Sequence, residues 1–385
     1  MHKPLENIRV VELGAVITGP LAANLLGELG AEVIKVENPN GGDPFRSFLG
    51  GLYSPHFRAY NKNKKSIALD LSQPENQDKL KAVLETADVM IDNFRPGVLD
   101  RLGLGEAVLT KLNPRLIRCS ITGFGSSGPY SRRPAYDAVA QAISGIAGLF
   151  LDKARPRLAG PTISDNVTGM YAALGVLAAL HERNRTNMGR RVEVSMIESS
   201  VAFIPDQFAF DEAGMEITPF TRVAASQSYA VFCADGKPLA LHLSSLPKFW
   251  ESLLKAIERP DLLEDPRFVT RPDRFRNYEE LQDILSEVFA TRPRGEWVER
   301  LQEVEVPFAP VNDISEIPDD PQIRHLETFY RMAASDGTMV RSTHCPIWFD
   351  GARAEPQSAP PLLGEHNELY LGETRKEADG TKNQP

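Results

Sequence analysis

Cysteine is scarce in this sequence of 385 residues, and long apolar runs are missing. The three cysteines, Cys119, Cys233 and Cys345, lie far apart, which argues against a disulfide framework and against the paired spacing of a zinc site. No apolar run approaches the roughly 18 residues that a membrane-spanning helix needs. The first residues also contain no signal-peptide core. We therefore expect a cytoplasmic protein that binds no metal ion and no membrane.

An excess of basic residues is missing as well. The chain has 43 lysines and arginines against 52 acidic residues, a net charge of −9, which argues against nucleic acid as the main partner. A small polyphosphate ligand needs only a local group of cations. Residues 58–65 place four cations within eight positions. This segment is either a solvated surface turn or a phosphate-binding edge, and Lys35, Arg46, Arg95 and Arg101 are candidates to assist such an edge.

The glycine fingerprint of dinucleotide-binding proteins is absent. A β-rich run at residues 8–13 is followed by Gly14, Gly19 and Pro20, and then by a helical pattern at residues 21–29. The spacing of the glycines does not match the fingerprint, and Pro20 is typical of the first turn of a helix. The sequence therefore argues against a nicotinamide cofactor.

Strand and helix patterns alternate through the first part of the chain. The apolar pattern predicts strands at residues 8–13, 31–36, 66–70, 88–91 and 116–121, with helices at 21–29 and 76–86. Such alternation is typical of an α/β fold, here a large Rossmann-like domain with a mostly parallel sheet. Ligands of these folds bind beyond the carboxyl ends of the strands.

The second half of the chain predicts a smaller domain. We expect residues 1–215 to form the first part of the large domain and residues 225–305 to form a small α+β domain. Residues 320–385 are expected to return to the large domain and complete it. Within the small domain, the sequence Ala-Asp-Gly-Lys at residues 234–237 predicts a β-hairpin.

In residues 160–183, three polar residues at positions 164–166 precede a long helical pattern. From Val167 onward, apolar residues recur at spacings of three and four, which predicts a helix with one buried face. Asp165 therefore lies at or near the start of this helix, where unpaired N–H groups and the helix dipole favour its ionised form. Two interpretations stay open at this point: Asp165 caps the helix, or it is an ionised nucleophile.

Several short segments follow one another in a distinctive order and spacing. They are residues 33–37 (VIKVE) with Gly42, Asp43 and Arg46, 61–66 (NKNKKS), 92–97 (DNFRPG), 120–125 (SITGFG), 136–137 (YD) with Gln141, 164–165 (SD) with Gly169 and Met170, and 307–313 (PFAPVND). Together they resemble the class III CoA-transferases. That family includes formyl-CoA transferase and the carnitine CoA-transferases, and the α-methylacyl-CoA racemases are its close relatives. The resemblance runs from about residue 5 to about residue 370.

This resemblance implies an enzyme that needs no cofactor and whose substrates are an acyl-CoA and a small carboxylic acid. Asp165 matches the aspartate that attacks the thioester and carries CoA through a covalent aspartyl intermediate. The family also forms homodimers of two interlocked chains, so we expect an interlocked homodimer. By position, the resemblance assigns CoA binding to Ile17, Thr18, Asn61, Lys62, Asn63, Lys64, Asn93, Phe94, Arg95, Arg101, Tyr136 and Asp137.

Two other functions are compatible with parts of this sequence. An α-methylacyl-CoA racemase needs one group that removes a proton and another that delivers one. The racemases have a histidine at the position of Tyr136, and a phenol that ordinarily titrates near pH ~10 is a poor acid–base group at neutral pH. In a non-catalytic CoA-binding protein, Asp165 would only stabilise the helix that it begins.

The sequence also departs from formyl-CoA transferase at two places. Asn38 stands where that enzyme has an arginine, so this contact to CoA is missing, and Lys35 or Arg46 would have to replace it. Residues 224–229 lack the run of glycines that covers the formyl-CoA transferase site. This second departure argues against oxalate as the acceptor acid.

Overall fold

The computed structural model describes residues 3–51, 53–244, 246–334, 337–356 and 358–372. They form two compact units. The larger unit falls within Met1–Ala147, Arg157–Ile204 and His325–Pro385, and the smaller unit within Gly148–Pro156 and Pro205–Arg324. Compared with the predicted ranges 1–215, 225–305 and 320–385, the smaller unit begins earlier and also takes in residues 148–156.

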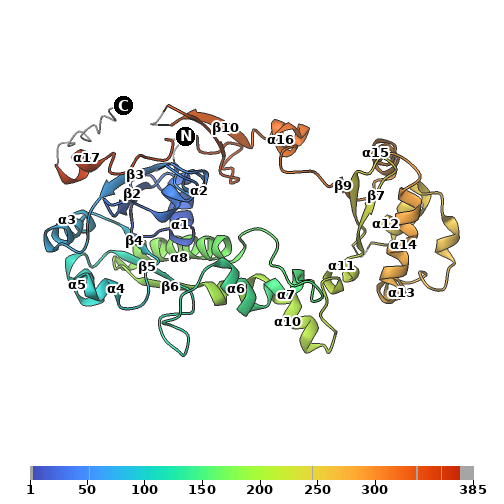
Figure 1. Cartoon of the computed structure of the whole chain (residues 1–385), viewed down its shortest axis with the longest axis horizontal. Coiled ribbons are helices and arrows are strands. Elements are labelled where there is room, and N and C mark those ends of the chain that lie inside the picture. The colour runs from blue at the N-terminus through green and yellow to red at the C-terminus, as the bar shows by residue number, and fades with distance from the viewer. Residues whose placement is uncertain (1–2, 52, 245, 335–336, 357, 373–385) are drawn as a thin grey trace, which may run out of the picture. The chain divides into compact units, whose positions relative to one another are not determined.

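The larger unit contains a parallel sheet of six strands in the order β3-β2-β1-β4-β5-β6 (Figure 1). At its centre, Val10 of β1 is paired with Val33 of β2 on one side and with Val89 of β4 on the other. The predicted α/β fold with a mostly parallel sheet is therefore confirmed. The strands are β1 (Arg9–Glu12), β2 (Glu32–Glu37), β3 (Lys64–Ala68), β4 (Val89–Asp92), β5 (Ile117–Thr122) and β6 (Arg191–Ser195).

Helices cover both faces of this sheet because its strands carry apolar residues on both sides. Successive residues of a strand point to opposite faces. Val10 packs in a core cluster with α1 (Thr18–Glu28) and α8 (Ser164–Thr186), whereas Val11 packs in a cluster with α3 (Pro74–Glu85) and α5 (Glu106–Leu112). Both valines are completely buried. The carboxyl ends of the strands are left for the loops that form the site.

The C-terminal part of the chain covers the edge strand β3. Just before α17 (Asn367–Leu371), His366 donates its backbone N–H to Ser66 O at 2.9 Å and accepts from Ser66 N through Nδ1 at 3.2 Å. The side chain of Asn367 accepts from Ala68 N at 2.8 Å. An uncovered edge strand is a template for unwanted pairing with other chains. These contacts therefore protect the sheet as well as anchor the returning segment.

The smaller unit is built on a three-stranded antiparallel sheet. Its strands are β7 (Ser228–Phe232), β8 (Pro238–His242) and β9 (Phe308–Pro310), and α12 (Pro247–Ala256), α14 (Tyr278–Phe289) and α15 (Arg294–Glu303) contribute to its core. Trp250 and Trp297 are buried in that core. β7 and β8 form the predicted hairpin, and Gly236 in its turn has φ +72°.

Shorter elements connect these parts. β10 (Phe329–Ala333) and β11 (Met339–Thr343) form an antiparallel pair in the larger unit. The remaining elements are η1 (Pro44–Ser47), α2 (Pro55–Tyr60), α4 (Val98–Arg101), α6 (Asp137–Ser144), α7 (Ile146–Phe150), α9 (Met196–Phe203), α10 (Pro205–Glu212), α11 (Thr221–Ala225), η2 (Pro260–Leu263), α13 (Arg271–Arg276), η3 (Ile317–Asp319) and α16 (Pro321–His325).

Candidate active site

A cavity of about 380 Å³ opens at the carboxyl ends of β1, β4 and β5 in the larger unit. This is the position at which parallel α/β sheets bind ligands. Hydrophobic side chains form much of its wall, and three charged side chains, Arg95, Arg133 and Asp165, also line it. Of the residues assigned to the site from the sequence, the cavity brings together Ile17, Thr18, Asn93, Phe94, Arg95, Tyr136 and Asp165.

Asp165 lies in the first turn of α8 but does not cap the helix. The helix begins at Ser164 with Ile163 as its N-cap residue, and no side chain forms a cap hydrogen bond. The Asp165 side chain belongs instead to the cavity wall, where the residue is only 6% exposed. The structure therefore argues against the interpretation of Asp165 as a helix cap, one of the two that the sequence left open.

The electrostatic surroundings of Asp165 differ from the expectation based on its helix. Burial, together with the nearby carboxylate of Asp137, raises the pKa of Asp165 to about 7. Asp137 Oδ1 also accepts a hydrogen bond from the backbone N–H of Asp165 at 3.2 Å. The helix start favours the charged form, but desolvation outweighs it. A raised pKa in a cavity is typical of a functional carboxylate.

Close packing of α8 on α1 fixes the position of Asp165. A Cβ atom on Gly169, one turn after Asp165, would lie 3.0 Å from Thr18 O and 3.0 Å from Leu21 Cβ. A larger residue here would force the two helices apart by a few tenths of an ångström. Because Ile17 and Thr18 at the start of α1 line the same cavity, the unpaired N–H groups and positive dipole end of α1 lie at its wall.

The loop between β1 and α1, residues 14–17, is held by the half-buried side chain of Asn93. Asn93 accepts from Ala15 N at 3.0 Å and donates to Ala15 O at 2.7 Å and to Thr18 Oγ1 at 3.1 Å. Asn93 thus shapes the cavity through the loop. Val16 in this loop has φ +69°, a conformation that costs a β-branched residue on the order of 1–3 kcal/mol.

Two arginines supply positive charge to the cavity. Arg95 and Arg133 are both exposed, and neither forms an ion pair with a carboxylate in the described part of the chain. The Arg133 guanidinium lies 3.9 Å from the ring centre of Tyr130. The sequence pattern gave no signal for Arg133, although it lies only three residues before Tyr136.

Residues 61–64 line neither this cavity nor a second one described below, and their assignment to CoA binding stays a prediction. Asn61, Lys62 and Lys64 are buried, and their polar atoms have partners within the fold. Lys64 Nζ contacts Glu12 Oε2 at 2.7 Å, Asn61 Oδ1 at 2.8 Å and Pro20 O at 2.9 Å. Lys62 pairs with Glu28 at 2.5 Å, and Asn63 Oδ1 accepts from Ser358 N at 3.2 Å. These contacts indicate a structural role.

A second cavity of about 340 Å³ adjoins the carboxyl ends of β1, β2 and β3. Ala15 and Phe94 line both cavities, and Asn38 lines the second one. Lys35 and Arg46, the candidates to replace an arginine at position 38, are fully buried in ion pairs and so cannot take that role. Arg101 ends α4 and is exposed, but it lines neither cavity.

Within the described residues, no group of three or more histidine, cysteine, aspartate or glutamate side chains could hold a metal ion. None of the described helices is both long and apolar enough to cross a membrane.

A family model for CoA-transferase family III matches residues 5–367, and the chain belongs to this family. It is therefore an enzyme of the CoA-transferase class.

Characterised relatives cover nearly the whole chain. Succinyl-CoA:glutarate CoA-transferase from Homo sapiens is 30% identical over 98% of this chain and 87% of its own length. Acetyl-CoA:oxalate CoA-transferase from Acetobacter aceti is 35% identical over 83% of each chain. Among solved structures, Rv3272 from Mycobacterium tuberculosis has a TM-score of 0.85 at 31% identity, covering 96% of this chain and 99% of its own. A CAIB/BAIF family protein from Brucella suis has a TM-score of 0.83 at 29% identity, covering 97% and 99%.

Proposed function

We propose that Asp165 is the nucleophile with which this enzyme moves CoA from an acyl-CoA thioester to a carboxylic acid. The observation that carries this proposal is the placement of a buried carboxylate, with its pKa raised to about 7, in the wall of a cavity beside the start of α1. A carboxylate that titrates near neutral pH is partly ionised and more basic than an ordinary aspartate, which favours nucleophilic attack.

The proposed reaction passes through two kinds of covalent intermediate. An Asp165 oxygen attacks the thioester carbonyl carbon, the C–S bond breaks, and a mixed anhydride and CoA thiolate form. The thiolate attacks the aspartyl carbonyl, which releases the donor acid as a carboxylate and leaves an aspartyl-CoA thioester. The acceptor carboxylate attacks this thioester and expels the thiolate. The thiolate then attacks the acceptor acyl carbon, so that the new acyl-CoA forms and Asp165 is free again.

The groups around Asp165 support this chemistry. Each attack places negative charge on a carbonyl oxygen, which N–H donors at a helix start stabilise. The start of α1 offers such donors at the cavity wall. Asp137 holds the backbone at Asp165 through its hydrogen bond to the Asp165 N–H. Tyr136 is largely exposed at the cavity edge, where we expect it to contact the pantetheine chain or the acyl group.

The charges and the two cavities support a path for CoA. We propose that the thioester end enters the first cavity and that Arg95, assisted by Arg133, binds phosphate oxygens at its mouth. Phe94 lines both cavities, so the adenine end would pass it into the second cavity. Arg101, exposed on the neighbouring α4, is available to the remaining phosphate.

Small carboxylic acids are the proposed acceptors. The relatives named above act, by their names, on succinyl-CoA with glutarate and on acetyl-CoA with oxalate.

We propose a cytoplasmic location, which the three free and buried cysteines support.

Mass spectrometry of the intact protein tests the covalent step. With an accepted acyl-CoA such as succinyl-CoA or acetyl-CoA, we expect a species heavier than the free enzyme by one CoA thioester, which hydroxylamine removes. Asp165→Asn should show no such species under the same conditions. The proposal would be contradicted if turnover proceeds while no adduct forms. Exchange of the α-proton of a 2-methylacyl-CoA with deuterated water, without any acceptor acid, would indicate racemase activity instead.

An apolar surface supports the proposed homodimer. On α8, Met170 and Leu174 are 58% and 60% exposed, and Tyr171 lies beside them. Val139 and Ile143 of the neighbouring α6 are exposed as well. A contiguous apolar surface of this kind is unusual on a monomer. We propose that a second copy of the chain covers it, and the interlocking of the two copies stays a prediction.

Light scattering after size exclusion tests this proposal. We expect twice the chain mass of 42.6 kDa for the wild type. The double substitution Met170→Glu and Leu174→Glu should shift the protein to monomer, because two charges would have to be buried in the interface. Leu263→Glu, at another exposed leucine outside this surface, should leave the mass unchanged. A monomeric wild type would refute the dimer.

A further inference from the structure

We infer that Asp43 is a positioning residue of this enzyme, because its carboxylate holds the 14–17 loop in the conformation that shapes both cavities. This inference rests on the proposed binding of CoA in those cavities. Asp43 lines the second cavity but not the one that contains Asp165, so it lies away from the proposed nucleophile. It acts through the backbone of the loop, next to Ala15 and Ile17, which line the cavity that contains Asp165.

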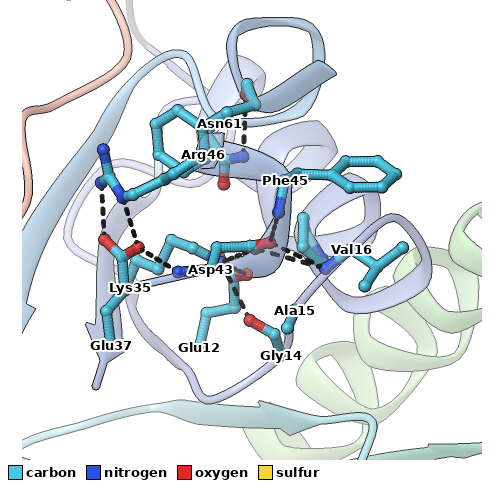
Figure 2. Close-up of polar contacts among 12 residues, drawn as sticks. Glu12, Gly14, Ala15, Val16, Lys35, Glu37, Asp43, Phe45, Arg46 and Asn61 are labelled. Carbon is cyan, nitrogen blue, oxygen red and sulfur yellow. Dashed lines mark hydrogen bonds and ion pairs between the residues drawn. The ribbon is translucent and has the colours of Figure 1, made fainter. Parts of the chain in front are cut away.

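The contacts of Asp43 are directed at the loop (Figure 2). Both carboxylate oxygens lie 3.2 Å from Val16 N, and Oδ1 also accepts from Phe45 N at 2.9 Å. Oδ2 lies 2.9 Å from Lys35 Nζ. Asp43 is 3% exposed, so these contacts are shielded from water and strengthened by the low local dielectric.

Lys35 links the other end of the same loop to Asp43. Its ammonium group donates to Gly14 O at 2.9 Å and pairs with Glu12 at 2.8 Å. Burial works against the charge of Lys35, but Glu12, Asp43 and Glu37 outweigh it and raise the pKa of Lys35. A single ammonium–carboxylate pair therefore binds the carbonyl of residue 14 and the amide of residue 16.

Asp43 is itself fixed by a second ion pair. Its backbone N–H donates to Glu37 Oε2 at 3.0 Å, and Arg46 Nε and Nη2 each lie 2.7 Å from the carboxylate of Glu37. The Arg46 guanidinium stacks 3.7 Å from the ring centre of Phe57. Because these groups are buried in a packed core, the Asp43 carboxylate has little freedom to move.

The conformation of Val16 shows what the contacts of Asp43 and Lys35 with the 14–17 loop do. Val16 is the only β-branched residue with a positive φ among the residues that the structure describes. Such a residue relaxes to a negative φ unless its surroundings prevent this. If Val16 relaxed in this way, its backbone N–H would turn away, and this is the N–H that Asp43 binds. Without the carboxylate, the loop between the two cavities would change shape, and Ile17 at the start of α1 would move with it.

Calorimetric binding of free CoA tests this inference. We expect Asp43→Asn to raise the Kd for CoA by about tenfold or more, which corresponds to about 1.4 kcal/mol, and to raise the KM for acyl-CoA in parallel. The decisive measurement is rescue. Adding Val16→Gly to Asp43→Asn should return the Kd to within about threefold of the wild type, because glycine adopts a positive φ without strain.

Asp88→Asn is the matched control. Asp88 also accepts a hydrogen bond from a backbone amide, that of Arg9 at 2.8 Å, and pairs with Arg183 at 2.8 Å. It lies just before β4, at the amino end of this strand, whereas the cavities lie at the carboxyl ends. Its substitution should lower the melting temperature and leave the Kd for CoA unchanged. If Asp43→Asn does not fold, Asp43→Glu keeps the charge beside Lys35 but displaces the carboxylate by one methylene, and the same weakening of CoA binding is expected.

Three outcomes separate the alternatives. A wild-type Kd in the folded Asp43 variants, with only a lower melting temperature, would overturn the inference and leave Asp43 a purely structural residue. Failure of Val16→Gly to rescue binding would also overturn it, since the loop conformation would then not be what Asp43 supplies. If the wild type itself binds no CoA, the proposed function fails, and this inference fails with it for that distinguishable reason.

Discussion

Replacing Asp165 by asparagine is expected to lower kcat by at least about a thousandfold while CoA still binds. The amide is nearly the same size as the carboxylate, so the cavity keeps its shape, but a neutral amide is not a nucleophile for a thioester. Turnover by the wild type should also depend on pH in a defined direction. Because the pKa of Asp165 is raised to about 7, kcat/KM should fall about tenfold for each pH unit below this value.

The same substitution should stabilise the protein at alkaline pH. A carboxyl whose pKa is raised from 3.8 in the unfolded chain to about 7 in the fold gives the native state a stability that is present below pH 3.8 and is lost as pH rises through 7. Asparagine has no such loss. We expect the free energy of unfolding of Asp165→Asn to exceed that of the wild type at pH 8, by an amount on the order of 2 kcal/mol, and the difference to shrink towards pH 4.

Urea unfolding at several pH values, together with steady-state kinetics, checks both parts. Glu75→Gln is a suitable control, since Glu75 is an exposed carboxylate in the first turn of another helix, α3. It should change neither kcat nor the pH dependence of stability. If Asp165→Asn retains more than about a tenth of the wild-type kcat, Asp165 is not the nucleophile.

Replacing Gly169 by alanine is expected to lower kcat by about three- to tenfold. The added Cβ would lie 3.0 Å from Thr18 O and from Leu21, so α8 must move away from α1. Asp165 sits one turn earlier on α8 and would move with it by a few tenths of an ångström, and since a 1 Å misplacement at a reacting group costs about a hundredfold, we expect this smaller effect. CoA affinity should fall much less, because the residues proposed to bind phosphates lie on other elements.

Gly295→Ala provides the comparison for this prediction. Gly295 also lies in a helix, α15, but a Cβ there would meet no atom within 4 Å. This variant should keep wild-type kcat, and its stability should stay the same or rise by up to about 1 kcal/mol through better helix propensity. A kcat for Gly169→Ala within twofold of the wild type would show that the close contact of α1 and α8 is not needed to place Asp165.

Much of the fold was predictable because local patterns and long-range packing agree. Strand and helix patterns alternate along the chain, which predicted a parallel sheet covered by helices. Val10 and Val11, neighbours in β1, are buried on opposite faces of that sheet, as this prediction requires. The hairpin at residues 234–237 was predictable from its Asp-Gly turn. Asp165 could be singled out as the start of a helix, but its raised pKa could not, because Asp137 approaches it only in the folded chain.

The partners of the basic residues could not be predicted from the sequence. Four cations at residues 58–65 suggested a phosphate-binding edge, yet Lys64 pairs with Glu12, which lies in the first strand. A sequence shows the number of charges in a segment but not the partner that a distant strand brings. Asp43 belongs to the segments that carry the family resemblance, but its role could not be predicted for the same reason, since its partners Val16 and Lys35 are brought to it only by the fold.

The covering of β3 by the segment around His366 also has a consequence during protein synthesis. The two partners, Ser66 and His366, are 300 residues apart in the chain. At translation rates of about 5–20 residues per second, the ribosome needs roughly 15–60 seconds to make the chain between them. The nascent protein therefore carries β3 as an uncovered edge strand for most of its time on the ribosome, and its larger unit reaches its final form only when the segment around His366 emerges.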